Sequence, residues 1–445
     1  MRNPIPFAAL ALALAAAQAR ADTIDVTSTT MLQLGEQTRG RAGLVEPELV
    51  TAAPLFEILS IAARDVTNPL ADDLALVVST WGAYELQDLR WDNGTSSELH
   101  GDVVTMYAQG KLLDRHLTLR IGREHVMTGA ARMIHLDGGE AILRLPAGVR
   151  LSAYGGLPVS QRFASRGTLQ SWNPAGGDVA FGGRAAWSLA FPGYPGRGLD
   201  VGASANFVQD DGDPVREEVS ADARLQPLGD DLTFTGLVAY SLYDERVSEV
   251  AGRASWSVTR ALRLEADGRY FAPDLFLARN SILSVFASEQ RTTWGAGLDY
   301  ELGHGLAIGA SYHLATEPGE EIGDDDYLGH EADASVEWHA GPSRAGAELQ
   351  YLDAVENGYV AVRLFGRRDL GKLFATADVF SHFFRESING EDLAVSGTLA
   401  AGVNLSKGFS AVVSGSAGLN PFLEQTFDVM AKLVYNSTYR VREVR

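Results

Sequence analysis

Cysteine is absent from this chain of 445 residues. Its absence excludes disulfide bonds, thiolate metal sites, cysteine nucleophiles and the lipid anchor of a lipoprotein. Basic residues are also scarce, since 37 Lys and Arg face 57 Asp and Glu and give a formal net charge of −20. Nucleic-acid binding requires clustered positive charge, so this balance argues against a nucleic-acid partner.

Long apolar runs are absent as well. The longest, "FAALALALAAA" at 7–17, follows Arg2 and is shorter than the roughly 20 residues that a spanning helix needs. With its basic start and the small residues Ala19 and Ala21, the segment is typical of a secretory signal cut before Asp22. A membrane anchor is the alternative. We expect residues 1–21 to be a cleaved signal peptide and the exported chain to lack a transmembrane α-helix.

Alternation with a period of two dominates the rest of the chain. In "LRLEADGRYF" at 262–271, apolar residues or glycine alternate with charged ones, and 102–112, 178–191, 329–341 and 391–408 show similar alternation. Successive side chains of a strand point to opposite faces, so each segment has an apolar face and a more polar face. The pattern predicts an antiparallel sheet.

Strand and loop lengths predict a membrane barrel. Many alternating segments span about 10 to 14 residues, which suits a tilted membrane-crossing strand better than a soluble sheet. Short connections at 146–148, 259–261, 303–305 and 406–408 alternate with long polar ones at 88–101, 158–177, 272–286 and 316–327. We expect an all-β transmembrane antiparallel barrel of about 22 strands (range 16–22) over residues 22–440, with a C-terminal extension at 441–445 and no plug domain. A soluble sandwich or propeller is the alternative.

Aromatic residues on the apolar face sort by strand end. The short-turn end carries Trp187, Trp256, Tyr300, Trp338 and Tyr435, and the long-loop end carries Phe207, Tyr240, Tyr270, Tyr312, Tyr351 and Phe427. Two aromatic belts around an apolar band are typical of the two membrane interfaces. The apolar face is therefore expected to meet lipid, and the charged face to line a watery lumen.

Residues 117–139, "LTLRIGREHVMTGAARMIHLDGG", resemble bacterial outer-membrane porin-like proteins. The matching positions of this motif, a strand ending in Leu-Arg-x-Gly-Arg, a loop arginine and a following Asp-Gly, are Leu119, Arg120, Gly122, Arg123, Arg132, Asp137 and Gly138. The resemblance implies passive diffusion of small hydrophilic solutes or ions across the outer membrane of a Gram-negative bacterium. Such proteins usually end on an aromatic that the outer-membrane assembly machinery reads, whereas "VREVR" follows Tyr439 here.

The start "DTIDVT" at 22–27 resembles the short box by which energy-coupled outer-membrane receptors engage an inner-membrane partner. Those receptors carry a large plug before the barrel, and fewer than 60 residues separate Asp22 from Trp81 here. We interpret the box as a chance match within the first strand.

The charged face supplies the candidate functional residues. Twelve are expected to line the lumen: Arg216, Glu218, Asp222, Arg224, Arg263, Glu265, Asp267, Arg269, Glu289, Arg291, Glu331 and Asp333. They form either a mutually paired, solvated lining or a surface that selects ions by charge. The 158–177 loop is the candidate constriction, through Arg162, Arg166 and Trp172. The acidic outer loop at 317–327 predicts a weak preference for cations.

Two other chemistries have weaker patterns. Glu321, Asp324, Asp325 and Asp326 could hold calcium, but the spacing lacks the glycine turn of a dedicated calcium loop. Glu124, His125, His135 and Asp137 meet at one outer loop, where a hydrolase would need a nucleophile such as Thr128. None of the nine histidines has a spacing that forces a metal site, so we expect no metal, cofactor or catalytic residue.

The sequence therefore predicts a porin-like channel in the outer membrane. Its expected partners are the lipid bilayer, lipopolysaccharide, the assembly machinery and small hydrophilic solutes or ions. A barrel that does not transport, with a structural, adhesive or assembly role through its outer loops, is the second interpretation. A barrel hydrolase is the third. The sequence leaves the solute and the oligomeric state open.

Overall fold

The structure is a computed structural model. It describes residues 21–39, 48–68, 71–86, 99–127, 133–163, 169–172, 178–191, 196–210, 212–272, 290–317, 327–354, 357–421 and 423–440. Within these residues, no helix has the length and apolar character needed to cross a membrane. The described helical content is a single 3-10 turn, η1 at Pro146–Gly148.

Strands make up nearly all of the described chain. The first twelve are β1 (Ala21–Arg39), β2 (Glu48–Ala52), β3 (Pro54–Asn68), β4 (Ala71–Glu85), β5 (Leu99–Leu112), β6 (Leu117–Val126), β7 (Ile134–Arg144), β8 (Val149–Pro158), β9 (Ser160–Phe163), β10 (Leu169–Trp172), β11 (Val179–Ala190) and β12 (Gly198–Asp210). The others are β13 (Asp213–Asp230), β14 (Leu232–Ser241), β15 (Arg246–Ser257), β16 (Leu262–Phe271), β17 (Arg291–Gly303), β18 (Leu306–Glu317), β19 (Tyr327–Ala340), β20 (Ser343–Asp353), β21 (Gly358–Leu370), β22 (Leu373–Ile388), β23 (Glu391–Ser406), β24 (Phe409–Asn420) and β25 (Leu423–Arg440).

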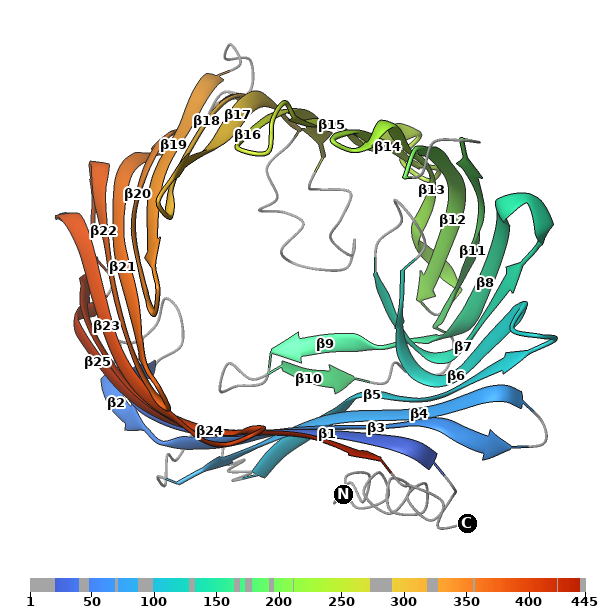
Figure 1. Cartoon of the computed structure of the whole chain (residues 1–445), viewed down its shortest axis with the longest axis horizontal. Coiled ribbons are helices and arrows are strands. Elements are labelled where there is room, and N and C mark those ends of the chain that lie inside the picture. Colours follow the sequence, from blue (N-terminus) through green and yellow to red (C-terminus); the bar gives the residue numbers. More distant parts are fainter. Residues whose placement is uncertain are drawn as a thin grey trace.

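The strands form a closed antiparallel barrel, as predicted (Figure 1). Each wall strand pairs with its neighbours along the chain, and β1 closes the ring by pairing with β25 from Thr23↔Arg440 to Gly35↔Asp428. β2 and β3 both pair with β1 and occupy one position in the wall, while β9 and β10 pair only with each other. The wall therefore contains 22 strands and closes on itself.

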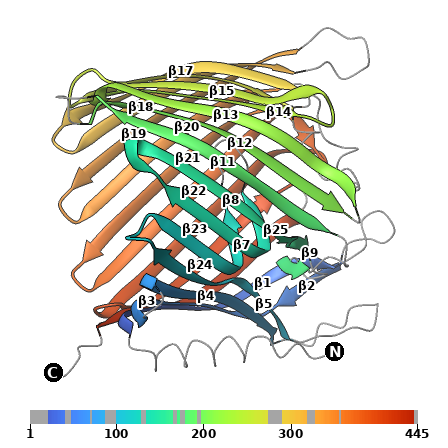
Figure 2. The same cartoon turned by 90° about the vertical axis from the view of Figure 1, so that its right-hand side faces the viewer.

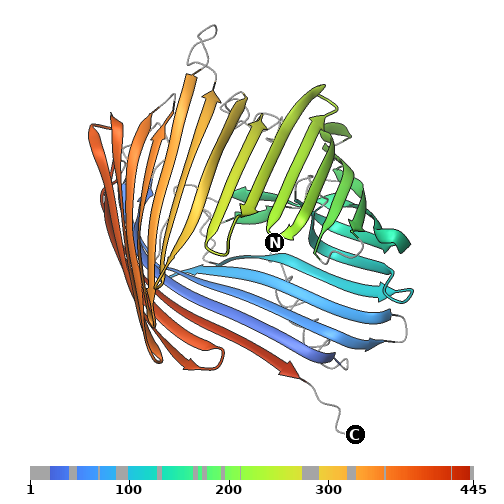
Figure 3. The same ribbon diagram turned by 45° about the horizontal axis from the view of Figure 1, so that its top comes forward.

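The strands are tilted (Figures 2 and 3). The start of β1 and the end of β25 lie side by side at the same end of the barrel. Most connections at that end are tight turns, such as His304–Gly305 and Lys407–Gly408. Gly408 has φ of +87°, and a Cβ there would collide with the carbonyl of Asn436. The long connections that the sequence predicted, at 88–101, 158–177, 272–286 and 316–327, join strands at the opposite end. Other connections there, such as 389–390, are as short as the turns, so the alternation of short and long connections is partial. The "DTIDVT" box lies within β1.

Candidate functional site

One face of the barrel wall is apolar over most of its area, although Glu57 on β3 lies on it and accepts hydrogen bonds from Ser28 and Thr30 of β1. Register pairs carry it from strand to strand, as in the row Leu262, Tyr300, Ile308 and Val336 across β16 to β19. Large side chains on this face remain exposed, with Leu364 at 54% and Leu399 at 69%. Aromatic rings lie toward both strand ends of the same face, including Trp256, Trp338, Tyr312, Tyr351 and Phe427. A soluble protein would bury such a band, so this face is the membrane surface.

The other face is concave, because its side chains bond across an intervening strand. Tyr154 on β8 donates to Asn206 on β12 at 2.5 Å, and Gly182 of β11 lies between them. Similarly, His313 Nε2 on β18 lies 3.2 Å from Asp267 on β16, with Gly295 between them. A Cβ at either glycine would strike these bridging side chains. This face lines the lumen.

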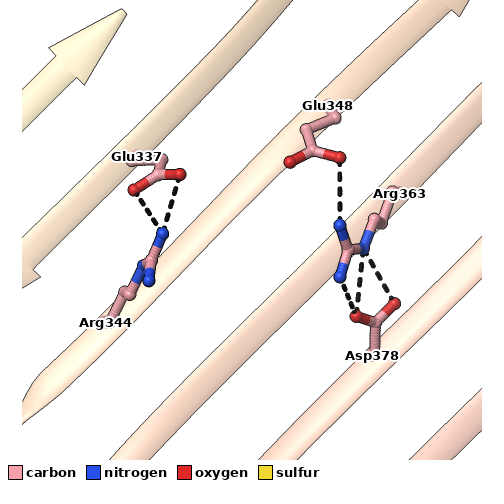
Figure 4. A network of polar contacts seen from close by, with 5 residues as sticks. All are labelled: Glu337, Arg344, Glu348, Arg363 and Asp378. Atoms are coloured by element: carbon pink, nitrogen blue, oxygen red, sulfur yellow. Dashed lines mark hydrogen bonds and ion pairs between the residues drawn. The ribbon is translucent and has the colours of Figure 1, made fainter. Parts of the chain in front are cut away.

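The lumen wall of β19 to β22 carries a network of ion pairs (Figure 4). Glu337 on β19 accepts from Arg344 on β20 at 2.9 and 3.0 Å. One strand further on, the Arg363 guanidinium lies 2.6 Å from Asp378 and 3.3 Å from Glu348. Charge-assisted bonds of this kind hold long side chains in fixed positions along the wall.

Strand alternation places eleven of the twelve predicted lining residues on the lumen face. Asp222 pairs with Arg184, Glu265 with Arg253 and Arg263, Asp267 with His313, and Arg269 with Glu249. Glu218 is 4% exposed and accepts from Ser248 at 3.2 Å. Arg216, Arg224, Arg291, Glu331 and Asp333 share this face by the same alternation. Glu289 lies outside the described residues.

A second buried cluster lies on the lumen face of β6 and β7. Arg120 Nη1 is 3.1 Å from Glu140 and 3.8 Å from Glu124, so one guanidinium serves two carboxylates. Glu124 is 1% exposed, and neither of its oxygens has a hydrogen bond among the described residues. Burying a carboxylate without hydrogen bonds costs stability, and the shared arginine offsets part of that cost.

The candidate hydrolase loop does not assemble a catalytic arrangement in the described residues. Glu124 points to the lumen, whereas His125 and His135 stack on the opposite face with their rings 4.0 Å apart. Asp137 is held by Arg123 at 2.7 Å, and Thr128 lies outside the described residues. Across the described chain, no histidine bonds a serine or threonine hydroxyl, which the nucleophile of such an enzyme would require.

The candidate constriction is a strand hairpin and not an irregular loop. β9 and β10 pair from Ser160↔Trp172 to Phe163↔Leu169, and the hairpin lies inside the ring of strands beside β5 (Figure 1). Arg162 belongs to β9 and Trp172 to β10, while Arg166 lies outside the described residues. The inward position of this hairpin is visible only in the closed ring of strands and has no signal in the sequence.

No group of three or more potential metal ligands occurs among the described residues. The calcium candidates Glu321, Asp324, Asp325 and Asp326 lie outside them.

Several lumen residues were missed from sequence. The clearest are Glu348, Arg363 and Asp378 of the ion-pair network, together with Phe380, His382 and Phe384 on β22. "DVFSHFF" at 378–384 has the period-two signal that could have found them, because its alternate residues share one face. Aromatic residues on both faces of β22 obscured that signal.

The chain is similar to several solved structures. The translocation pore of the P pilus usher, PapC, gives a TM-score of 0.50 at 9% identity, over 94% of this chain and 99% of that one. OccAB4 of Acinetobacter baumannii gives 0.46 at 9% over 94% and 99%, and OpdK of Pseudomonas aeruginosa, solved with vanillate, gives 0.44 at 11% over 94% and 98%. Neither a protein-family model nor a curated protein sequence matches the chain.

The apolar outer face, its two aromatic girdles and the closed ring together require a bilayer around the wall. The usher pore shows the same kind of fold. The protein is therefore a 22-stranded β-barrel of the cell outer membrane.

Proposed function

We propose that the barrel is a porin-like channel through which small hydrophilic solutes or ions diffuse passively, with a weak preference for cations. The observation that carries this proposal is the exposure of charged side chains inside the ring. Arg253, Arg263 and Arg269 point into the lumen, yet their side chains are 56%, 51% and 50% exposed. Water therefore reaches the inner wall, where a packed core would exclude it.

The proposed cation preference rests on the balance of charge on the lumen wall from β16 to β22. On the lumen face of β16 to β22, the arginines are Arg263, Arg269, Arg291, Arg344, Arg363 and Arg367. The carboxylates there are Glu265, Asp267, Asp299, Glu301, Glu331, Asp333, Glu337, Glu348, Asp369 and Asp378. The excess of carboxylates concentrates cations near this wall.

Conductance of the refolded protein in a planar bilayer tests both parts of the proposal. A salt gradient across the bilayer should give steady current steps with a reversal potential on the cation side. Higher ionic strength should reduce that preference, because salt screens the wall charges. A folded, inserted barrel that passes no current would refute the channel, and an anion-side reversal potential would refute the cation preference.

The inward hairpin favours a second candidate function. β9 and β10 lie inside the ring of strands and take up part of the lumen. If they occlude it, the barrel would serve instead as a structural, adhesive or assembly component. We propose that Arg162, Arg166 and Trp172 narrow the lumen. Replacing residues 160–172 by a short Gly-Ser linker should then raise the conductance. A silent native barrel that conducts after this deletion would support the second candidate.

We also propose how the chain is processed at its ends and which components of the outer membrane it contacts. Residues 1–21 would be removed on export, so that the mature chain begins at Asp22 within β1, and the intact mass of the mature chain checks this cleavage. Residues 441–445 would form an extension after the last strand. Lipopolysaccharide would contact the outer aromatic girdle, and the assembly machinery would insert the barrel despite the extension after Tyr439. Deleting residues 441–445 and measuring the yield of heat-modifiable barrel tests whether the extension matters.

A further inference from the structure

A pocket of about 410 Å³ lies in the lumen wall between β16 and β22. Its size is within the range of small-molecule sites. Two rows of register partners cross the wall at this pocket, and all of their members except Arg263 and His382 line it. One row is Arg263, Asp299, Gly309, Ser335, Glu348, Arg363 and Phe380, and the other is Glu265, Gly297, Ser311, Asp333, Gln350, Ala361 and His382.

Glycines open the floor of this pocket. A Cβ at Gly309 would lie 2.7 Å from Ser335 Oγ and 3.1 Å from Asp299 Oδ1, and a Cβ at Gly297 would lie 3.2 Å from Ser311 Cβ. Any side chain at Gly309 would therefore occupy the space onto which the Asp299 carboxylate faces. Because these two positions carry no side chain, the side chains of Asp299, Ser335 and Ser311 lie over the floor of the pocket.

The charges around the pocket do not balance. Glu265 is paired with Arg253 and Arg263, and Arg363 is shared by Glu348 and Asp378. Asp299 and Asp333 have no ion-pair partner among the described residues, although Asp333 accepts from Ser311 at 3.2 Å. These three arginines and five carboxylates leave two negative charges at the pocket, which favour a cationic ligand.

One aromatic side chain forms the side of the pocket at β22, and other rings lie beside it. Phe380 lines it, and its ring lies 4.3 Å from that of His382, which in turn lies 5.1 Å from Tyr359 and 6.0 Å from Phe384. Elsewhere on this wall, guanidinium groups already lie over phenylalanine rings, with Arg363 5.0 Å from Phe365 and Arg367 4.6 Å from Phe374. Positively charged groups on this wall thus already make cation–π contacts with aromatic rings.

We infer that the pocket binds organic ammonium ions that carry an apolar body, with the charge between Asp299 and Asp333 and the body against Phe380. Carboxylates alone would attract any small cation, and rings alone would attract any apolar solute. Their juxtaposition selects a ligand that has both. The inference rests on the proposed channel, because the ligand reaches the pocket through the lumen.

Binding of benzyltrimethylammonium to the detergent-solubilised barrel tests the inference by calorimetry. Tetramethylammonium supplies the charge without the ring, and benzyl alcohol supplies the ring without the charge. We expect each to bind at least tenfold more weakly than benzyltrimethylammonium. Equal binding of benzyltrimethylammonium and tetramethylammonium would overturn the role of the aromatic side, and equal binding of benzyl alcohol would overturn the role of the carboxylates.

Three variants locate the site. Asp333→Asn and Phe380→Leu should each weaken benzyltrimethylammonium binding by about tenfold. Asp428→Asn on β25 removes a lumen carboxylate that does not line the pocket and should leave binding unchanged. A loss of binding in Asp428→Asn equal to that in Asp333→Asn would show general charge attraction and refute the site. Heat modifiability on gels confirms that each variant is folded before its binding is compared.

The outcomes separate the pocket from the channel. Binding that follows the variants in a barrel that passes no current would uphold the pocket and refute transport. A conducting barrel to which benzyltrimethylammonium does not bind would uphold transport and refute the pocket. In a conducting barrel, benzyltrimethylammonium should also reduce potassium current, and Phe380→Leu should relieve that block.

Discussion

On the lumen face, some polar side chains reach across an intervening strand because that strand carries a glycine between them. Tyr154 reaches Asn206, His313 reaches Asp267 and Arg184 reaches Asp222 because a glycine stands between each pair. On a concave face, side chains two strands apart converge, and a glycine leaves the path open. Glycine in a strand usually weakens it, so these positions exchange strand stability for polar contacts in the lumen.

Gly182→Ala should destabilise the barrel by about 1–3 kcal/mol, because the new Cβ would displace the Tyr154 hydroxyl and leave the buried Asn206 without this donor. Urea unfolding of the barrel refolded into lipid vesicles measures the change. Gly236→Ala is the matched control, since its Cβ would meet no atom closer than 3.7 Å. If both substitutions shift the free energy of unfolding equally, the bridging role of Gly182 is wrong.

At the scale of the strand, the two faces have different solvents. Leu399 in the middle of β23 is 69% exposed on the membrane face, and its neighbour Thr398 points into the lumen. The same strand therefore must satisfy lipid on one side and water on the other, and period-two alternation is the only pattern that does so.

Leu399→Arg should cost about 2–4 kcal/mol, because it places a charge in the apolar band, whereas Thr398→Arg should be tolerated in the aqueous lumen. The free energy of unfolding from lipid vesicles and the fraction of heat-modifiable barrel measure the difference. Equal effects at the two positions would contradict the assignment of the faces.

At the scale of the whole molecule, closure depends on two segments from opposite ends of the chain. β1 pairs with β25 along thirteen register positions, so the ring cannot close until the last strand has been made. A contact of this sequence separation forms late and at high entropic cost.

Because the chain has no cysteine, the double substitution Thr29→Cys and Val434→Cys would introduce one possible disulfide, between β1 and β25, which reports whether the barrel is closed. The two positions are register partners, so a disulfide should form under oxidising conditions and keep the barrel compact on a heated gel until reductant is added. Thr29→Cys with Val412→Cys, one strand further away, should not crosslink. Crosslinking of both pairs, or of neither, would contradict the observed register.

The sequence by itself determined the class of fold and the two faces of the wall. Alternation, strand length and the sorting of Trp256, Trp338, Tyr312 and Tyr351 by strand end are local signals, and the bilayer imposes them on every strand separately. The barrel of about 22 strands could therefore be predicted without any knowledge of long-range contacts.

Only the tertiary structure decided which lumen residues meet. Register and curvature bring Arg363 to Asp378, leave Asp299 and Asp333 in the pocket at Gly309, and set Phe380 at its side. The inward turn of β9 and β10 also became visible only once the ring was closed. Each of these depends on the register between strands and on the curvature of the wall, and an alternating pattern specifies the face of a residue but not its neighbours across the sheet.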